Sequence, residues 1–132
     1  LADALQRTGG TDIIVDQLVS ISSGASPQVL WVWLFFITAL LTNILSNTAS
    51  AVLMTPIAIS IATQLGVSPY PMAMTVLFAA SAAFMTPIAS PIITLIVEPG
   101  KYRFTDFIKL GTPMLVWVFA CCYFLIPFFF PW

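Results

Sequence analysis

Charged side chains are scarce in this sequence. Only 7% of its 132 residues are Asp, Glu, Lys or Arg, and residues 17–97 contain none of them. With four basic residues and a net charge of -1, the chain lacks the clustered Lys and Arg that binding to a phosphate backbone requires. We therefore expect no nucleic-acid partner.

Histidine is absent, and cysteine is limited to the adjacent pair Cys121 and Cys122. A disulfide framework or a metal cluster therefore has no ligands to build on. No carboxylate pair is visible, and Ser46 has no histidine that could activate it as a nucleophile. We expect neither an enzyme nor a bound cofactor. The chain begins at Leu1 without a signal-peptide pattern, and we expect it to be part of a longer protein.

Hydrophobic residues make up 60% of the chain, and its mean hydropathy is +1.04. Both values lie far outside the usual soluble range. Because helices satisfy their own backbone hydrogen bonds in lipid, we predict an all-α integral membrane protein that crosses a plasma or inner membrane several times.

The first 66 residues divide into two parts. Residues 1–26 mix charged and apolar positions, which is typical of an interfacial arm, although a solvated connector fits equally well. In residues 27–66, an apolar run over 29–41 would span only ~20 Å as a helix, and the run over 49–65 is also short of the ~20 residues that a crossing needs. We predict a re-entrant helical hairpin whose tip is Ser46-Asn47-Thr48; a kinked helix capped by Asn47 is the competing interpretation.

Residues 69–97 predict a discontinuous transmembrane helix. Its first part should run to Met85, and Pro87 and Pro91 should break it, because proline lacks an amide hydrogen and disfavours helix in the residue before it. Freed carbonyls and the Ser90 hydroxyl would then form a second polar spot. A simple proline kink is the alternative.

Residues 98–109 hold three of the four basic residues, which favours a cytoplasmic loop. Residues 110–132 predict a last transmembrane helix that ends in aromatic side chains at the interface. The carboxyl terminus and the open end of the hairpin are then external.

Two uncharged polar clusters at membrane depth are typical of the midplane site of a secondary transporter. Amino-terminal ends of half-helices attract anions, whereas carboxyl-terminal ends and unwound carbonyls attract sodium. Because residues 17–97 contain no Lys or Arg, a bound anion needs other compensation. Coupling to sodium follows as a hypothesis.

Three motifs extend the argument: Ser46-Asn47-Thr48 within residues 41–50, Ala83-Phe84-Met85-Thr86-Pro87, and Pro99-Gly100-Lys101-Tyr102-Arg103-Phe104. Together they resemble the divalent anion/sodium symporter family over nearly the whole chain. The resemblance implies a permease for a dicarboxylate, citrate or sulfate, of which this chain is the carboxyl-terminal part, the second half of an inverted-repeat transporter. A missing amino-terminal half would supply the rest of the site, and the full-length protein would be a homodimer.

The resemblance also implies which residues bind. Substrate contacts fall on Ser46, Asn47, Thr48 and Ser90, and sodium contacts fall on Thr42, Ser46, Asn47, Ala89, Ser90 and Pro91. The sequence departs from the pattern at Ile93, where many relatives carry Asn, and at Glu98, which is often Gly. These departures leave the identity of the anion open.

Two other functions stay open. A proton-coupled or oxyanion-exporting permease of the same architecture is disfavoured because residues 17–97 contain no intramembrane carboxylate. A non-transporting membrane subunit would use the same breaks only for helix contacts.

Overall fold

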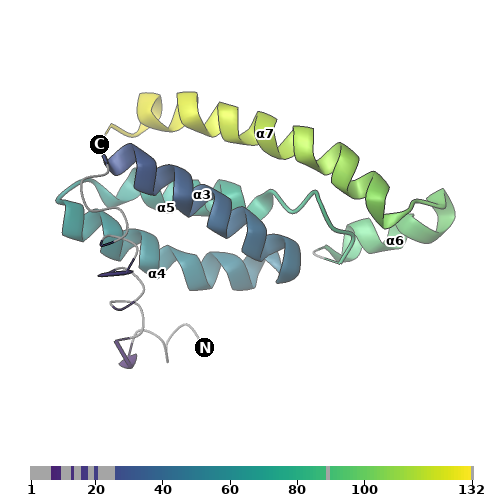
Figure 1. Cartoon of the computed structure of the whole chain (residues 1–132), viewed down its shortest axis with the longest axis horizontal. Helices are drawn as coiled ribbons and strands as arrows, with labels where there is room; N and C mark the ends of the chain where they lie inside the picture. The colour runs from purple at the N-terminus through teal and green to yellow at the C-terminus, as the bar shows by residue number, and fades with distance from the viewer. Residues whose placement is uncertain are drawn as a thin grey trace.

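The computed structural model describes residues 7–9, 13, 16, 17, 20, 26–88 and 90–131, so the predicted interfacial arm falls largely outside the described residues. The described part contains five helices and no strand, and the prediction of an all-α fold is confirmed (Figure 1). The helices are α3 (Pro27–Ile44), α4 (Asn47–Leu65), α5 (Pro69–Ser81), α6 (Pro91–Gly100) and α7 (Phe104–Phe129). By length and composition, α3, α4 and α7 are candidates to cross a membrane.

Helices α3 and α4 run antiparallel and form a hairpin with a two-residue turn (Figure 1). Leu45 and Ser46 are both extended at this turn. Ser46 caps α4, because its hydroxyl accepts a hydrogen bond from the Ala49 amide at 3.3 Å. At the far end, Gly66 takes the left-handed conformation, with φ of 65°, that ends many helices.

The two arms are longer than the apolar runs from which they were predicted. Helix α3 has 18 residues and α4 has 19, so each extends ~27 to 29 Å. The expectation that the two arms are too short to cross a membrane is therefore wrong, because both helices are long enough to do so. Pro27 starts α3 early, since proline is well tolerated in a first turn. The helix continues through Thr42 and Asn43, whose side-chain oxygens bond to the Ala80 carbonyl and the Met85 amide.

The predicted interruption of the next helix is present, but it begins earlier than expected. Helix α5 ends at Ser81 and not at Met85, and residues 82–90 lie between it and α6. The Ala82 amide bonds to the Ala79 carbonyl at 3.0 Å, a tight turn that stops the helix before either proline is reached. Pro91 occupies the first turn of α6, where its missing amide hydrogen costs nothing.

The charged segment predicted as a loop over 98–109 is mostly helical. Helix α6 continues to Gly100 and α7 begins at Phe104, so the link is three residues long. Lys101 ends α6 with a positive φ of 50°. The Asp106 carboxylate accepts a hydrogen bond from the Arg103 amide at 2.8 Å and thereby caps the start of α7.

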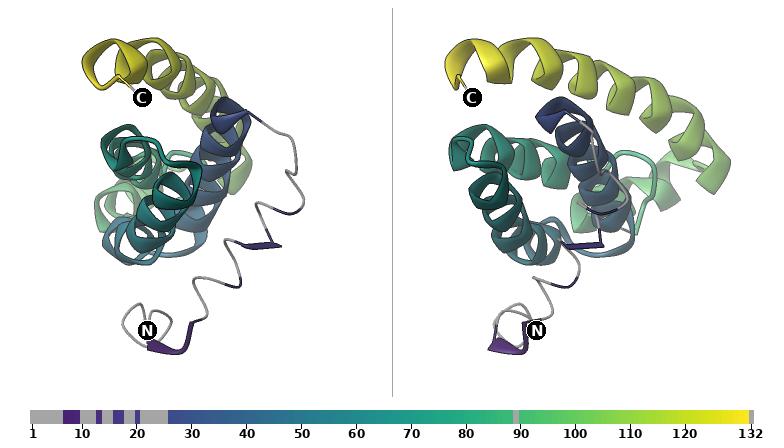
Figure 2. Two further views of the ribbon diagram at one scale, coloured as in Figure 1. Left: turned by 90° about the vertical axis from the view of Figure 1, so that its left-hand side faces the viewer. Right: turned by 60° about the vertical axis from the view of Figure 1, so that its left-hand side comes forward.

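The core lies where α3, α4 and α5 meet, and α7 lies along one side of these helices (Figures 1 and 2). A second cluster joins α3 to α7, with the rings of Trp31 and Tyr123 5.6 Å apart. Helix α6 has no buried residue. The hairpin turn and the interruption after α5 lie at the same end of the three-helix core, where Thr42 bonds to the Ala80 carbonyl and Asn43 to the Met85 amide.

Candidate functional site

Three elements meet at the buried side chain of Thr42, which is 0% exposed in the last turn of α3. Its hydroxyl oxygen lies 2.9 Å from Asn47 Oδ1, at the start of α4, and 2.6 Å from the Ala80 carbonyl, at the end of α5. A hydroxyl has one hydrogen and serves one acceptor at a time. Three oxygens therefore converge while only one hydrogen is shared among them, an arrangement that suits a small cation.

Three helix ends meet at this point. Helices α3 and α5 end here and present carbonyl groups, whereas α4 begins here and presents amides. The negative ends of two helix dipoles are thus combined with the positive end of a third. Because residues 17–97 carry no charged side chain, these partial charges dominate the local electrostatics. The arrangement can accept both a cation and an anion.

The predicted hairpin motif lies at the turn, with different exposure at each position. Ser46 and Thr48 are exposed, and Asn47 is half-buried. Asn47 is therefore the residue of the motif whose side chain reaches the Thr42 hydroxyl. One turn further along α4, the Ser50 hydroxyl is fully buried and has no hydrogen-bond partner among the described residues.

In the second predicted cluster, a carbonyl that was expected to be free has a hydrogen-bond partner. The Pro87 carbonyl, which Pro91 leaves without a helical amide, lies 2.6 Å from the Thr94 hydroxyl. The Ser90 carbonyl lies 3.1 Å from the same hydroxyl, which can donate to one of the two carbonyls at a time. Ser90 is half-buried and makes no capping bond through its side chain, and Pro91 is exposed. Ala89 lies outside the described residues. Within the described part of the chain, no hydrogen bond joins Ser90 to Ser46 or Asn47.

The sequence-based site did not include Asn43, which the structure places between the hairpin and the interruption. Its Nδ2 donates to the Ala39 carbonyl at 2.7 Å, and its Oδ1 accepts from the Met85 amide at 3.0 Å. Its own carbonyl accepts from the Thr86 hydroxyl at 2.5 Å. The signal in the sequence was a second polar residue beside Thr42 at the end of an apolar run.

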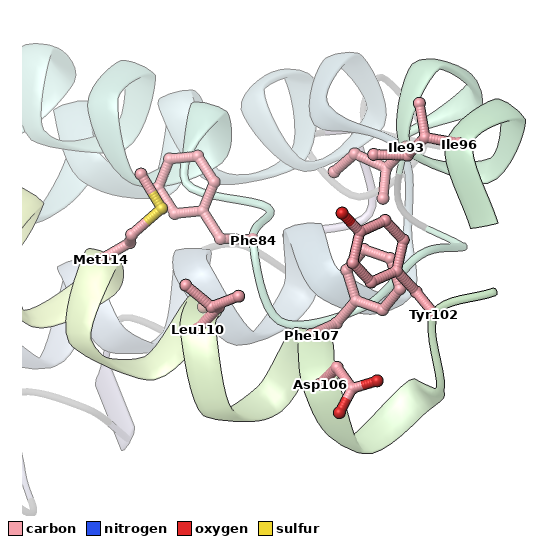
Figure 3. A pocket seen from close by; sticks show the side chains of 9 residues that line it. Phe84, Ile93, Ile96, Tyr102, Asp106, Phe107, Leu110 and Met114 are labelled. Carbon is pink, nitrogen blue, oxygen red and sulfur yellow. The ribbon is translucent and has the colours of Figure 1, made fainter. Parts of the chain in front are cut away.

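Two recesses lie near this region, and their walls are almost wholly apolar. One, of about 380 Å³, is lined by Asn43, Thr86 and side chains of α3 and α7. The other, of about 270 Å³, lies between α6 and α7, where Phe84, Ile93 and Tyr102 border it (Figure 3). Its one charged wall residue, Asp106, is already bonded to the Arg103 amide. Neither recess offers the donors that a divalent anion needs.

Membrane-length helices, a turn and an interruption that meet through hydrogen bonds, and an uncharged polar centre define an all-helical membrane transporter. The model of the citrate transporter family, CitMHS, matches residues 1–132. The chain belongs to this family.

Known relatives agree with this assignment. The chain is 51% identical to the uncharacterized transporter YfbS of Escherichia coli over 98% of its length, which is 21% of that protein. It is 27% identical to sodium/sulfate cotransporter 1 of Chlamydomonas reinhardtii over 95% of its length, which is 14% of that protein. It is 29% identical to the Na(+)/citrate cotransporter of Rattus norvegicus over 86% of its length, which is 20% of that protein.

The chain thus spans about a fifth or less of the length of these relatives. The family and the relatives are transporters and not enzymes, as the absence of a nucleophile with a base predicted. The resemblance to anion and sodium symporters is confirmed at the level of the family.

Proposed function

We propose that the full-length protein moves a divalent anion of the dicarboxylate, citrate or sulfate class across the membrane together with sodium, and that this chain supplies half of the site. The main support for this proposal is a cluster of three oxygen atoms, which are Thr42 Oγ1, Asn47 Oδ1 and the Ala80 carbonyl oxygen. They lie at helix ends whose partial charges no charged side chain neutralises. The names of the sodium/sulfate and Na(+)/citrate relatives support the same chemistry.

Sodium is held by oxygens at the ends of α3 and α5. With an ion bound, the Thr42 hydroxyl hydrogen turns to Asn47 Oδ1, and the lone pairs of Thr42 Oγ1 and the Ala80 carbonyl face the ion. The other sodium ligands are oxygens of residues that the sequence predicts for the two polar clusters. These residues are Ser46, Ala89, Ser90 and Pro91.

The anion is held by donors at the starts of α4 and α6. Ser46, Asn47 and Thr48 bring amide and hydroxyl hydrogens to the start of α4, and Ser90 does so at the start of α6. A sodium ion beside the anion supplies a positive charge, since residues 17–97 contain no Lys or Arg that could do so. Sodium and anion therefore bind more tightly together than apart, which is the physical basis of symport.

The proposed topology follows from the same elements. Residues 27–66 form a re-entrant hairpin that opens outward, residues 69–97 the broken transmembrane helix, residues 98–109 the cytoplasmic segment and residues 110–132 the last crossing, so that the carboxyl terminus is external. The amino-terminal half of the full-length protein supplies a second hairpin that completes the site, and two copies form a dimer. The relatives' greater length supports a missing half.

The test uses the full-length protein in liposomes and measures uptake of labelled citrate, succinate and sulfate with and without an inward sodium gradient. We expect accumulation of at least one of these anions only with the gradient. Asn47→Asp should lower that uptake by about tenfold or more, because a carboxylate in place of the amide repels the anion. Gln64→Glu makes the same amide-to-carboxylate change at the other end of α4 and should leave uptake unchanged.

Equal uptake without a sodium gradient would overturn sodium coupling. Accumulation driven by a proton gradient would instead favour the proton-coupled permease. Unchanged uptake by the Asn47→Asp protein would remove Asn47 from the site.

A further inference from the structure

We propose that Asn43 is a positioning residue, which holds the unwound segment 82–90 against the end of α3 and so fixes the spacing of the sodium oxygens on either side. The inference rests on the proposed function for its transport readout. Asn43 does not itself contact the ion or the anion.

The Met85 amide has no partner within helix α5. In a continuous helix this amide would bond to the carbonyl four residues earlier, that of Ser81, but α5 has ended there. A backbone amide left without a partner inside a membrane is strongly unfavourable, because no water replaces the missing acceptor. Asn43 Oδ1 accepts this hydrogen at 3.0 Å and replaces the missing helical bond.

The Asn43 side chain is 6% exposed, and its hydrogen bonds fix its orientation. Its Nδ2 donates to the Ala39 carbonyl at 2.7 Å, so the amide group has a fixed orientation and its oxygen is directed to Met85. Its own carbonyl, an orphan at the end of α3, accepts from the Thr86 hydroxyl. One residue thus both donates and accepts, which neither a leucine nor an ionised aspartate can do.

Thr42, the neighbour of Asn43, contacts the other side of the interruption. Thr42 bonds to Ala80, just before the interruption, while Asn43 bonds to Met85 and Thr86, within it. Successive residues of a helix point about 100° apart, so the last turn of α3 reaches both sides of the gap. The end of α3 therefore clamps the interruption at two points, one of which belongs to the ion site.

The experiment replaces Asn43 by leucine in the full-length protein, which removes the donor and the acceptor at similar volume. We expect the sodium concentration for half-maximal uptake to rise about tenfold, because the buried Met85 amide loses its acceptor. The anion concentration for half-maximal uptake at saturating sodium should change little. Thr38→Val is the matched control, because the buried Thr38 hydroxyl bonds only to the Leu34 carbonyl of its own helix. It should leave the sodium dependence unchanged.

Asn43→Asp provides a rescue test. A protonated carboxyl group can donate to the Ala39 carbonyl and accept from the Met85 amide, whereas the carboxylate can only accept. Relative to the unaltered protein at the same pH, the variant should regain its sodium affinity as the pH is lowered. A sodium affinity of Asn43→Asp that stays below that of the unaltered protein at every pH would overturn the proposal, and this variant decides the matter if Asn43→Leu fails to fold.

A distance measurement separates this inference from the proposed function. Spin labels at Leu40 and Ile88, in a protein whose Cys121 and Cys122 are replaced by alanine, report the separation of α3 from the unwound segment. The distance distribution should broaden in Asn43→Leu and stay narrow in Thr38→Val. If uptake proves independent of sodium but the distribution broadens, the clamp stands while sodium coupling fails. An unchanged distribution together with unchanged sodium dependence overturns the role of Asn43.

Discussion

At the scale of single residues, the partner of a hydroxyl separates structural positions from the candidate site. Most hydroxyls of the long helices donate to the carbonyl four residues earlier in the same helix, which satisfies them without any other element. Those that do so are Thr38, Thr55, Thr63, Thr75, Ser81 and Thr112. Thr42 instead bonds to residues of two other elements. A hydroxyl in an apolar helix thus indicates a site only when its own helix does not satisfy it.

Lys101 gives a prediction at the same scale. Its φ of 50° is a left-handed conformation that costs a residue with a side chain about 1 kcal/mol or more, whereas glycine adopts it freely. Lys101→Gly should therefore raise the melting temperature of the full-length protein in detergent. Lys101→Ala removes the same charge but keeps the strained backbone, and it should give no increase. An equal gain in both variants would assign the effect to charge.

At the scale of elements, local chemistry made some features predictable. The turn at Ser46 could be predicted from the sequence, because a serine that caps a helix accepts a hydrogen bond from an amide only three residues further on. The observed bond from the Ala49 amide is of this kind. The start of α6 at Pro91 follows from proline geometry alone. Both features depend only on neighbours in the chain.

Other features depend on contacts between distant segments, which the residue pattern does not record. Helix α5 ends at Ser81 rather than Met85, where the Thr42 hydroxyl and the Asn43 amide group supply partners from 38 and 42 residues away. The position of the break was therefore predicted more accurately than its extent.

The contact of α7 with the interruption leads to a prediction about Gly111. A Cβ atom at this buried glycine would lie 2.4 Å from the Phe84 carbonyl oxygen and 2.9 Å from Met85 Cα. Because these are backbone atoms, they cannot move aside as a flexible side chain would. Gly111→Ala should push α7 away from the unwound segment, cost about 1–3 kcal/mol and lower the melting temperature.

The matched control for this variant is Thr112→Ala, an exposed neighbour whose hydroxyl bonds only within α7. It should change the melting temperature much less. If Gly111→Ala melts at the same temperature as the unaltered protein, the close approach of α7 has no energetic consequence.

At the scale of the whole molecule, the lengths of the helices bear on depth in the membrane. Helix α7 has 26 residues and extends ~39 Å, about 12 Å more than α3 with its 18 residues. Its start reaches beyond the hairpin turn, toward α6 (Figure 1). If α7 crosses the full membrane, the turn and the interruption after α5 stop short of the face where α7 begins. This relation supports a hairpin that reverses inside the membrane.

The reversal predicts a definite order of depths in the full-length protein. Single spin labels at Gln28, Gln64, Ile44 and Lys101, introduced after the native cysteines, among them Cys121 and Cys122, are replaced, can be ranked by their access to oxygen, which concentrates at the bilayer centre. Gln28 and Gln64 end the two arms and should lie near one membrane face, and Lys101 should lie near the other. Ile44, beside the turn, should lie deeper than all three. If Ile44 shares the depth of Lys101, then α3 and α4 cross completely, and the anion site must be sought at a surface rather than within the membrane.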